Sequence, residues 1–238
     1  MKKPVNIVHT SDTHLGDPYG HSASEESLKN VLDAVDSTKS NFLIIVGDVF
    51  DNERVSNDSV CFFLDQISRT NVPVIILPGN HDLMHSNSVY KRPIFKNSPQ
   101  NLYIFQNPNG EEIQFKNFGI SFWGKAMEEH SPKFKPLTNI SFGNNEFWKI
   151  ALAHGQFEEE GVNSGRSSLI SPQNIKESGC DYVALGHWDS FTDVSQDNIP
   201  AYYSGCPTKL SKQKTGMVSL INLDPSIGVS HTRYPLNS

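Results

Sequence analysis

The stretch Phe42–Asp48 (FLIIVGD) decides the fold, because a continuous apolar run ending in glycine and aspartate is typical of a strand buried in a parallel sheet. Two further stretches have the same form: Val5–Val8 leads into Thr10–Gly16 (TSDTHLG), and Val74–Leu77 leads into Pro78–Asp82 (PGNHD). The segments between them carry apolar residues at helical spacing, at Leu28, Val31, Leu32 and Val35 and then at Val60, Phe63, Leu64 and Ile67. Strand, helix, strand, helix, strand in this order predicts βαβ units with right-handed crossovers.

Shorter strands are predicted in the middle and at the end of the chain. Leu102–Phe105, Glu112–Phe115 and Ile120–Trp123 are separated by Asn/Gly turns, which predicts antiparallel hairpins. Ala201–Tyr203 and Met217–Leu223 are likewise expected to form antiparallel strands.

Two more buried strands and one helix start complete the pattern. Trp148–Ala153 runs into His154, and Tyr182–Leu185 runs into Gly186 and His187. Ser22 with Glu25 three positions later has the form of a capping box, which predicts that the first helix begins there. No internal repeat or linker interrupts the chain, so we expect residues 1–238 to form a single domain of the α/β class without a separate capping domain.

The composition limits the class of protein. The chain has 238 residues, of which 26 are acidic and 20 basic. Its net charge of −6 excludes a protein held to nucleic acid mainly by a large basic surface, though not one with a local basic groove. No apolar run approaches the roughly 18 residues that cross a membrane, and no apolar stretch follows Met1–Pro4 as in a secretory signal. Three cysteines without a CxxC pair indicate a reducing compartment, so we predict a cytoplasmic location.

Residues that bind metals follow every predicted buried strand. They are Asp12 and His14, then Asp48, then Asn80 and His81, then His154, and finally His187. Because ligands bind at the carboxyl ends of strands in α/β sheets, we expect these side chains to gather at one edge. Two divalent cations about 3.5–4 Å apart need one bridging carboxylate and separate donors for each ion, which this set supplies. Oxygen and nitrogen donors without cysteine favour Mn²⁺, with Fe, Zn²⁺ or Mg²⁺ as alternatives.

The combined pattern Asp12-Thr13-His14, Gly47-Asp48, Gly79-Asn80-His81-Asp82, Ala153-His154-Gly155 and Gly186-His187 resembles the calcineurin-like metallophosphoesterases. Thr10–Gly16, Gly47–Asp51, Asp181–His187 and Tyr202–Pro207 extend the resemblance to the SbcD-type DNA double-strand-break repair exonucleases. The resemblance implies a four-layer αββα sandwich, with two mixed β-sheets face to face and helices on the outside.

The resemblance also implies roles for single residues. By position, Asp12 and His14 hold the first metal ion, Asp48 bridges, and Asn80, His154 and His187 hold the second. His81 would face the leaving-group oxygen as a catalytic group, with Asp82 as its orienting partner. The family pattern Gly-His-x-His departs here, because Asp189 stands where the last histidine completes the first metal site. We expect Asp189 to ligate that ion, the alternative being that its shorter side chain does not reach.

Other charged or metal-binding residues lie outside the pattern. Five histidines belong to this group: His9, His21, His85, His130 and His231. Basic residues could neutralise a phosphate near the strand ends, although scattered ones usually lie on solvated surface. The candidates are Lys91, Arg92, Lys96, Lys209, Lys212 and Lys214.

The predicted function is that of a dinuclear-metal-dependent phosphoesterase, specifically a phosphodiesterase related to DNA repair exonucleases. A small-molecule or nucleotide phosphodiesterase or phosphatase is an alternative, and a non-catalytic interaction scaffold of the same fold is a third. An SbcC-type ATPase partner is not expected, because the chain leaves no residues for the segment that binds it. The expected partner is therefore a phosphoester substrate, either DNA or a nucleotide, and no membrane.

Overall fold

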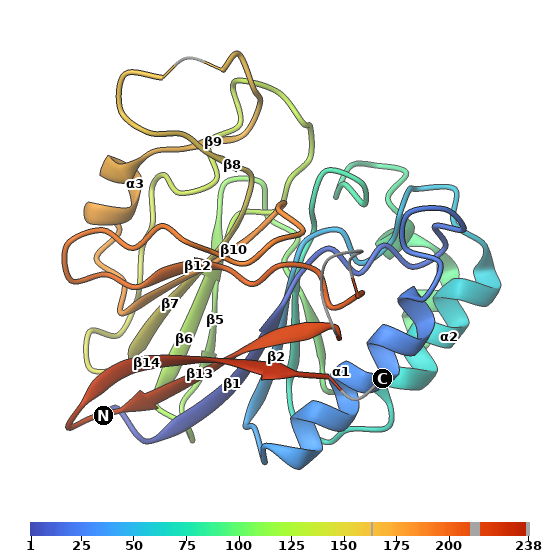
Figure 1. The fold of residues 1–238 in the computed structure, drawn as a ribbon, viewed down its shortest axis with the longest axis horizontal. Helices are drawn as coiled ribbons and strands as arrows, with labels where there is room; N and C mark the ends of the chain where they lie inside the picture. Colours follow the sequence, from blue (N-terminus) through green and yellow to red (C-terminus); the bar gives the residue numbers. More distant parts are fainter. Residues whose placement is uncertain (163, 210–214, 237–238) are drawn as a thin grey trace.

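Two six-stranded mixed β-sheets lie face to face at the centre of the molecule (Figure 1). This computed structural model describes residues 1–162, 164–209 and 215–236. The strand order is β14-β13-β1-β2-β3-β4 in the first sheet and β11-β12-β10-β7-β6-β5 in the second. The predicted α/β class with two mixed sheets is therefore confirmed.

The first sheet contains the predicted βαβ units. Four of its strands run parallel: β1 (Val5–Thr10), β2 (Phe42–Val46), β3 (Val74–Leu77) and β4 (Leu102–Ile104). β13 (Met217–Asp224) pairs antiparallel with β1, and β14 (Gly228–Pro235) pairs antiparallel with β13. The crossovers are α1 (Ser24–Ser37) and α2 (Asn57–Ile67), which lie on the side of this sheet away from the second sheet (Figure 1). The apolar positions predicted for both helices are buried, so each helix packs its apolar face on the sheet.

The second sheet is built from β5 (Glu111–Phe115), β6 (Ile120–Gly124), β7 (Trp148–His154), β10 (Tyr182–Gly186), β11 (Thr192–Asp193) and β12 (Ala201–Tyr203). Its strands alternate between two apolar layers, because successive side chains of a strand point to opposite faces. On β7, Ile150 and Leu152 join the core between the sheets, whereas Ala151 and Ala153 join an outer layer with Ile175. Ile175 belongs to the short helix α3 (Pro172–Lys176), which covers this outer face beside β8 (Gln156–Phe157) and β9 (Leu169–Ile170).

Two strand pairings differ from the predictions. β4 does not form a hairpin with β5: it pairs parallel with β3, and the turn at 107–110 carries the chain from the first sheet to the second. β12 pairs parallel with β10, and only its contact with the two-residue β11 is antiparallel. In both cases turn chemistry marks where the chain reverses but not which strand it then joins, since pairing depends on contacts far along the sequence.

The predicted start of the first helix is also wrong. α1 begins at Ser24 with Ala23 as its N-cap, and no side chain caps it. The residues before it form a loop around Asp17, whose carboxylate accepts hydrogen bonds from the backbone N–H groups of Tyr19, Gly20 and His21. Ser22 therefore lies in this loop instead of capping the helix.

No helix in the described ranges is long and apolar enough to span a membrane. The three cysteines, Cys61, Cys180 and Cys206, are free.

Candidate metal centre

The ends of five strands bring the predicted donors together at the junction of the two sheets. β1, β2 and β3 of the first sheet lead into the segments with Asp12, His14, Asp48, Asn80 and His81. β7 ends in His154 and β10 is followed by His187, so the second sheet supplies the other two histidines. We call these seven residues the strand-end cluster. The donors thus come from the edges of two sheets, and not from the edge of one as the sequence suggested.

Four donor atoms of the cluster fit one metal ion. Asn80 Oδ1 lies 3.0 Å from His154 Nε2 and 3.0 Å from His187 Nδ1, and His154 Nε2 lies 3.3 Å from Asp48 Oδ2. Atoms that bind one ion at about 2.1 Å and at right angles lie about 3.0 Å apart. His154 Nδ1 donates to the Val46 carbonyl at 2.9 Å, which fixes the ring with Nε2 toward the Asn80 and Asp48 oxygens, where a bound cation would replace the Nε2 proton.

A second group of donors shares one residue with the first. One oxygen or nitrogen from each of Asp12, His14 and Asp48 lies within 4.8 Å of the other two, and all three residues are buried. Asp48 therefore belongs to both groups, and a carboxylate that bridges two ions would have to lie between the groups in this way. Nδ1 of His14 is buried without a hydrogen-bond partner among the described residues. A buried polar atom left unpaired in this way is expected where a ligand is missing.

The backbone of the cluster adopts conformations that ordinary residues avoid. Asp12, His14, Asp48 and His187 have φ values of 54°, 46°, 53° and 114°, all in the region that favours glycine. Such conformations cost free energy, and they occur mostly where a function requires them. Gly47 also has positive φ, and a Cβ at this position would fall on the His154 imidazole. The turn after β2 therefore requires glycine so that His154 can approach the chain closely.

The charges of the cluster are arranged around a place for a cation. Burial, helped by the nearby Asp48, raises the pKa of Asp12. Burial also opposes ionisation of Asp48, but the neighbouring His154 ring holds the pKa of Asp48 well below its usual range. In return, Asp48 raises the pKa of His154 to about 9, although burial acts in the opposite direction. Burial and the charge of His154 lower the pKa of His187 to about 4, so its lone pair is free at neutral pH. Two buried carboxylates with imidazoles beside them are typical of a divalent metal site, and a bound cation would take the place of the proton on His154.

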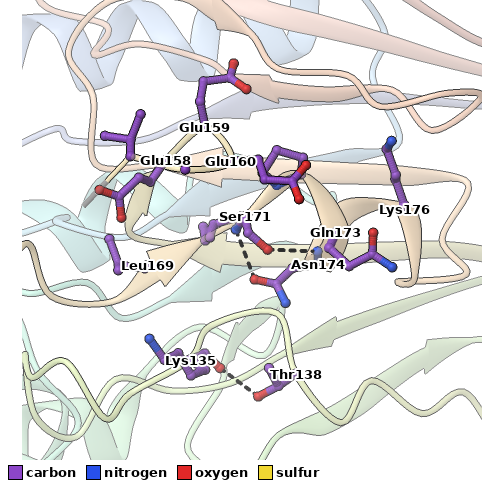
Figure 2. A pocket seen from close by; sticks show the side chains of 14 residues that line it. Lys135, Thr138, Glu158, Glu159, Glu160, Leu169, Ser171, Gln173, Asn174 and Lys176 are labelled. Atoms are coloured by element: carbon purple, nitrogen blue, oxygen red, sulfur yellow. Dashed lines mark hydrogen bonds between the residues drawn. The ribbon is translucent and has the colours of Figure 1, made fainter. Parts of the chain in front are cut away.

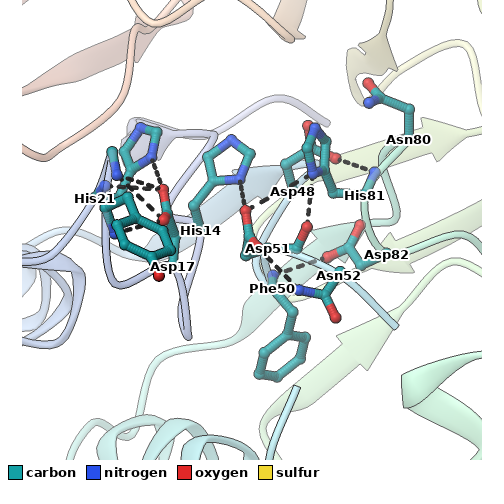
Figure 3. Close-up of polar contacts among 12 residues, drawn as sticks. His14, Asp17, His21, Asp48, Phe50, Asp51, Asn52, Asn80, His81 and Asp82 are labelled. Carbon is teal, nitrogen blue, oxygen red and sulfur yellow. Dashed lines mark hydrogen bonds and ion pairs between the residues drawn. The ribbon is translucent and has the colours of Figure 1, made fainter. Parts of the chain in front are cut away.

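His81 is exposed beside the buried donors, and its partner is not the predicted one. Its Nδ1 donates to the backbone carbonyl of Asp51 at 2.6 Å, which leaves Nε2 free, and its backbone N–H donates to Asp48 at 2.9 Å (Figure 3). Asp82 is fully buried and accepts from the N–H groups of Val49 (2.7 Å), Phe50 (3.3 Å) and Gly79 (2.7 Å). The hydroxyl of Tyr90 also donates to Asp82, at 2.5 Å. The expectation that Asp82 orients His81 is therefore corrected: Asp82 ties two loops together, and Asp51 holds the imidazole.

Asp189 lies beside a histidine that the sequence pattern did not single out. Donor atoms of His14, His21 and Asp189 lie within 4.8 Å of one another, and the rings of His14 and His21 stack at 4.4 Å. The Asp189 carboxylate, followed by Cys206 and Asp17, raises the pKa of His21 to about 11. Because His21 precedes α1 and belongs to no strand end, a search for donors after strands does not find it.

His130 is a second histidine that the pattern missed. It lies in the loop after β6 and its ring centroid is 6.2 Å from that of His187. The ring is exposed, and burial of its inner part followed by the charge of His154 lowers its pKa. The sequence places His130 more than 20 residues before the nearest predicted donor, so only the folded loop reveals its position.

The other candidates lie apart from the strand-end cluster or have other partners. The guanidinium of Arg92 donates to the backbone carbonyls of Val55 (2.7 Å) and Glu53 (2.6 Å), so it holds a loop. Lys212 and Lys214 lie outside the described residues. A surface pocket of about 670 Å³ beside β8, β9 and α3 shares no residue with the cluster, and its Ser171 and Asn174 are bonded to each other as a capping box (Figure 2).

Comparison with known proteins shows the family of this chain. The family of calcineurin-like phosphoesterases matches residues 5–190, and the chain belongs to this family. The chain is 25% identical over 241 residues to the uncharacterized metallophosphoesterase YhaO of Bacillus subtilis, covering 91% of this chain and 56% of that protein. It is 37% identical over 84 residues to a probable cyclic nucleotide phosphodiesterase of Fibrobacter succinogenes, covering 34% of this chain and 32% of that protein. It is 30% identical over 84 residues to the DNA double-strand break repair protein Mre11 of Nanoarchaeum equitans, covering 32% of this chain and 23% of that protein. The chain thus spans less than two thirds of the length of each of these relatives.

Solved structures share the fold at low sequence identity. TT1561 of Thermus thermophilus superposes with a TM-score of 0.60 at 11% identity, covering 97% of this chain and 99% of that chain. A dimetal phosphatase from Danio rerio superposes with a TM-score of 0.60 at 9% identity, covering 99% of this chain and 100% of that chain. These likenesses show that the chain shares the fold of these two proteins.

Proposed function

We propose that this chain is a phosphodiesterase that works with two divalent cations bound at the strand-end cluster. The observation that carries this proposal is the 3.0 Å spacing of Asn80 Oδ1 from two imidazole nitrogens, together with Asp48 shared between two donor groups. Donors so spaced can hold a pair of ions that share one carboxylate. Membership of the calcineurin-like phosphoesterase family supports the same reaction class.

Each residue has a defined task in this proposal. Asp12 and His14 hold the first ion, Asp48 bridges, and Asn80, His154 and His187 hold the second; Asp189 lies near the first position. When bound, such ions supply a nucleophile at neutral pH and polarise the phosphoryl oxygens. His81 presents its free Nε2 above the buried donors, since Asp51 fixes its other nitrogen. It can therefore donate a proton or a hydrogen bond to the leaving-group oxygen.

The metal that we propose is Mn²⁺. The donors of the cluster are carboxylate, amide and imidazole groups, and this mixture suits Mn²⁺ better than a site with thiolates would. Fe, Zn²⁺ and Mg²⁺ are the alternatives that a metal titration compares. A cytoplasmic location, where free cysteines persist, belongs to the same proposal.

For the substrate we propose a DNA end, as for an exonuclease, with a nucleotide phosphodiester as the second candidate. The identity shared with the Mre11 relative favours DNA, and that shared with the cyclic nucleotide phosphodiesterase relative favours the second candidate. Both matches cover about a third of this chain, so the two substrates have to be compared directly.

Hydrolysis of bis-p-nitrophenyl phosphate with added Mn²⁺ tests the reaction class. We expect turnover by the wild-type protein, a loss of at least about 100-fold in His81→Ala, and loss of both turnover and metal in Asp48→Asn. His231→Ala, a histidine on β14 that bonds to Ser219, is the matched control and should keep full activity. Absence of turnover with Mn²⁺, Fe²⁺, Zn²⁺ and Mg²⁺ would leave the non-catalytic scaffold as the function of this fold.

A substrate panel then separates the two candidates. Linear duplex DNA, 3′,5′-cyclic nucleotides and p-nitrophenyl phosphate are compared at equal phosphate concentration with the preferred metal. A kcat/KM at least tenfold higher for DNA supports the exonuclease. A preference for cyclic nucleotides or for the monoester rejects it.

A further inference from the structure

The first metal position lacks one nitrogen donor in this chain. Where the pattern Gly-His-x-His places a second histidine, this chain has Asp189, whose side chain is 49% exposed. An exposed carboxylate is a weaker anchor than a buried imidazole held by a partner, because water competes for both of its oxygens. A further nitrogen donor beside Asp189 would make up this difference.

The imidazole of His21 lies at this place and is held from behind. Its Nδ1 lies 3.1 Å from Asp17 Oδ2, and the same carboxylate accepts from the backbone N–H groups of Gly20 and His21 (Figure 3). The Asp17 carboxylate accepts hydrogen bonds only, so Nδ1 keeps its proton, and Nε2 is the nitrogen that can bind a metal ion once the ion displaces its proton. A carboxylate bonded to the far nitrogen of a histidine is the usual support of a metal-binding imidazole.

The free nitrogen of His21 faces other donors without bonding to them. Nε2 is buried and has no hydrogen-bond partner among the described residues, and the same is true of Nδ1 of the neighbouring His14, whose side chain is 9% exposed. Nε2 lies 3.6 Å from Asp189 Oδ1, which is too long for a hydrogen bond but fits two ligands of one ion.

We propose that His21, oriented by Asp17, is a ligand of the first metal ion and supplies the nitrogen donor that the Gly-His-x-Asp sequence lacks. This inference rests on the proposed two-metal function. It assigns a role to the loop before α1, which begins late because Asp17 folds the backbone at Tyr19–His21 around itself. The first position would then draw on Asp12, His14, Asp48, His21 and Asp189.

Metal binding is the direct test, with a readout that does not depend on turnover. Purified protein stripped with EDTA is titrated with Mn²⁺, and bound Mn²⁺ is counted by electron paramagnetic resonance and by mass spectrometry. We expect two ions in the wild type and a first-position affinity at least tenfold weaker in His21→Ala and His21→Gln. Asp17→Asn should weaken it by about 10–100-fold, because the imidazole loses its orienting partner. His231→Ala is the control and should bind as the wild type does.

The outcomes distinguish this inference from the proposed function. If Asp48→Asn loses metal while both His21 variants bind two ions with wild-type affinity, the inference fails and the two-metal function stands. If Asp48→Asn also binds as the wild type does, the two-metal function itself fails. Should the His21 variants misfold, anomalous scattering from a Mn²⁺-soaked wild-type crystal decides: an ion about 2.2 Å from His21 Nε2 supports the proposal, and one beyond 3 Å overturns it. An increase in KM with unchanged metal affinity would make His21 a substrate contact and would also overturn the proposal.

Discussion

Replacing Asp82 with asparagine distinguishes a structural role of this residue from a catalytic one. Asp82 accepts four hydrogen bonds in a fully buried position, three from backbone N–H groups and one from Tyr90. Asparagine has the same shape as aspartate, but an NH₂ group replaces one of the two acceptor oxygens. The hydrogens of this group would face the N–H or O–H groups that now donate to Asp82. At least one backbone N–H then loses its partner, which costs about 1–3 kcal/mol, and the lost bonds to a charged acceptor add about as much again. We therefore expect the free energy of unfolding to fall by about 3 kcal/mol.

Thermal unfolding of metal-free protein measures this change. For a chain of this length, 3 kcal/mol corresponds to a decrease in Tm of about 6–12 °C. Asp65→Asn, on the exposed side of α2, should shift Tm by no more than about 1 °C. Tyr90→Phe removes one of the four bonds and should cost about 1.5–2 kcal/mol.

Activity at 20 °C completes the comparison. We expect the folded Asp82→Asn protein to bind two ions and to keep the pH profile of kcat/KM, because the imidazole of His81 is held by Asp51. An unchanged Tm together with a 100-fold loss of turnover at full metal content would refute this reasoning, and Asp82 would again be the orienting partner of His81 that the sequence predicted.

Three further predictions concern the metal centre. Adding Mn²⁺ to 100 times its Kd should stabilise the protein by about 2.7 kcal/mol and raise Tm by about 5–11 °C, and EDTA should reverse this; an unchanged Tm contradicts metal binding to the folded state. In metal-free protein the pKa of His154 is raised to about 9, so the stability that its charge contributes is complete below pH 6.5 and is lost as the pH rises toward 9. The difference in Tm between wild type and His154→Gln should therefore narrow from pH 6 to pH 9.5, and a constant difference would argue against the pairing with Asp48. Gly47→Ala should weaken Mn²⁺ binding at least tenfold, because the new methyl group falls on the His154 ring. Gly161→Ala is the control, because Gly161 has a φ of 82°, close to the 85° of Gly47, and no atom lies within 4 Å of a methyl group added there. It should change stability but not metal affinity.

The sequence was sufficient for those parts of the fold that local patterns determine. Continuous apolar runs such as Phe42–Val46 and Val74–Leu77 became buried parallel strands with the predicted bounds. The donors could be predicted because ligands bind at the carboxyl ends of strands in α/β proteins, although the sequence did not show that these strands belong to two sheets. The pairing of β4 with β3 could not, since a three-residue strand carries too little pattern to select its neighbour and the choice depends on the whole sheet.

Side-chain partners were beyond sequence reasoning for a different reason. Asp82 follows His81 directly, so adjacency suggested a contact, but neighbouring residues of a tight turn point in different directions. His81 instead donates its hydrogen bond to the backbone carbonyl of Asp51, 30 residues earlier in the chain. A hydrogen bond to a backbone carbonyl cannot be predicted from residue types, because every residue carries the same carbonyl group. His21 was missed because its signal is the Asp17 loop, and the residue types of that loop also fit a helix start.

The structure implies that metal binding and the docking of the two sheets are coupled. Asp48 and Asn80 extend from the first sheet and His154 and His187 from the second, so any ion that they share joins both sheets at one edge. Without the ion, two buried carboxylates and four residues with positive φ make this edge costly. The pairing of His154 with Asp48 offsets part of this cost, and a bound cation would offset more, because the ion stabilises both carboxylates together. The edge should therefore be the first part of the metal-free protein to open, and amide hydrogen exchange at the ends of β2 and β10 should slow on adding Mn²⁺ while exchange at β13 does not change. Equal slowing throughout both sheets would mean that the ion stabilises the fold as a whole and that the two sheets do not separate at this edge.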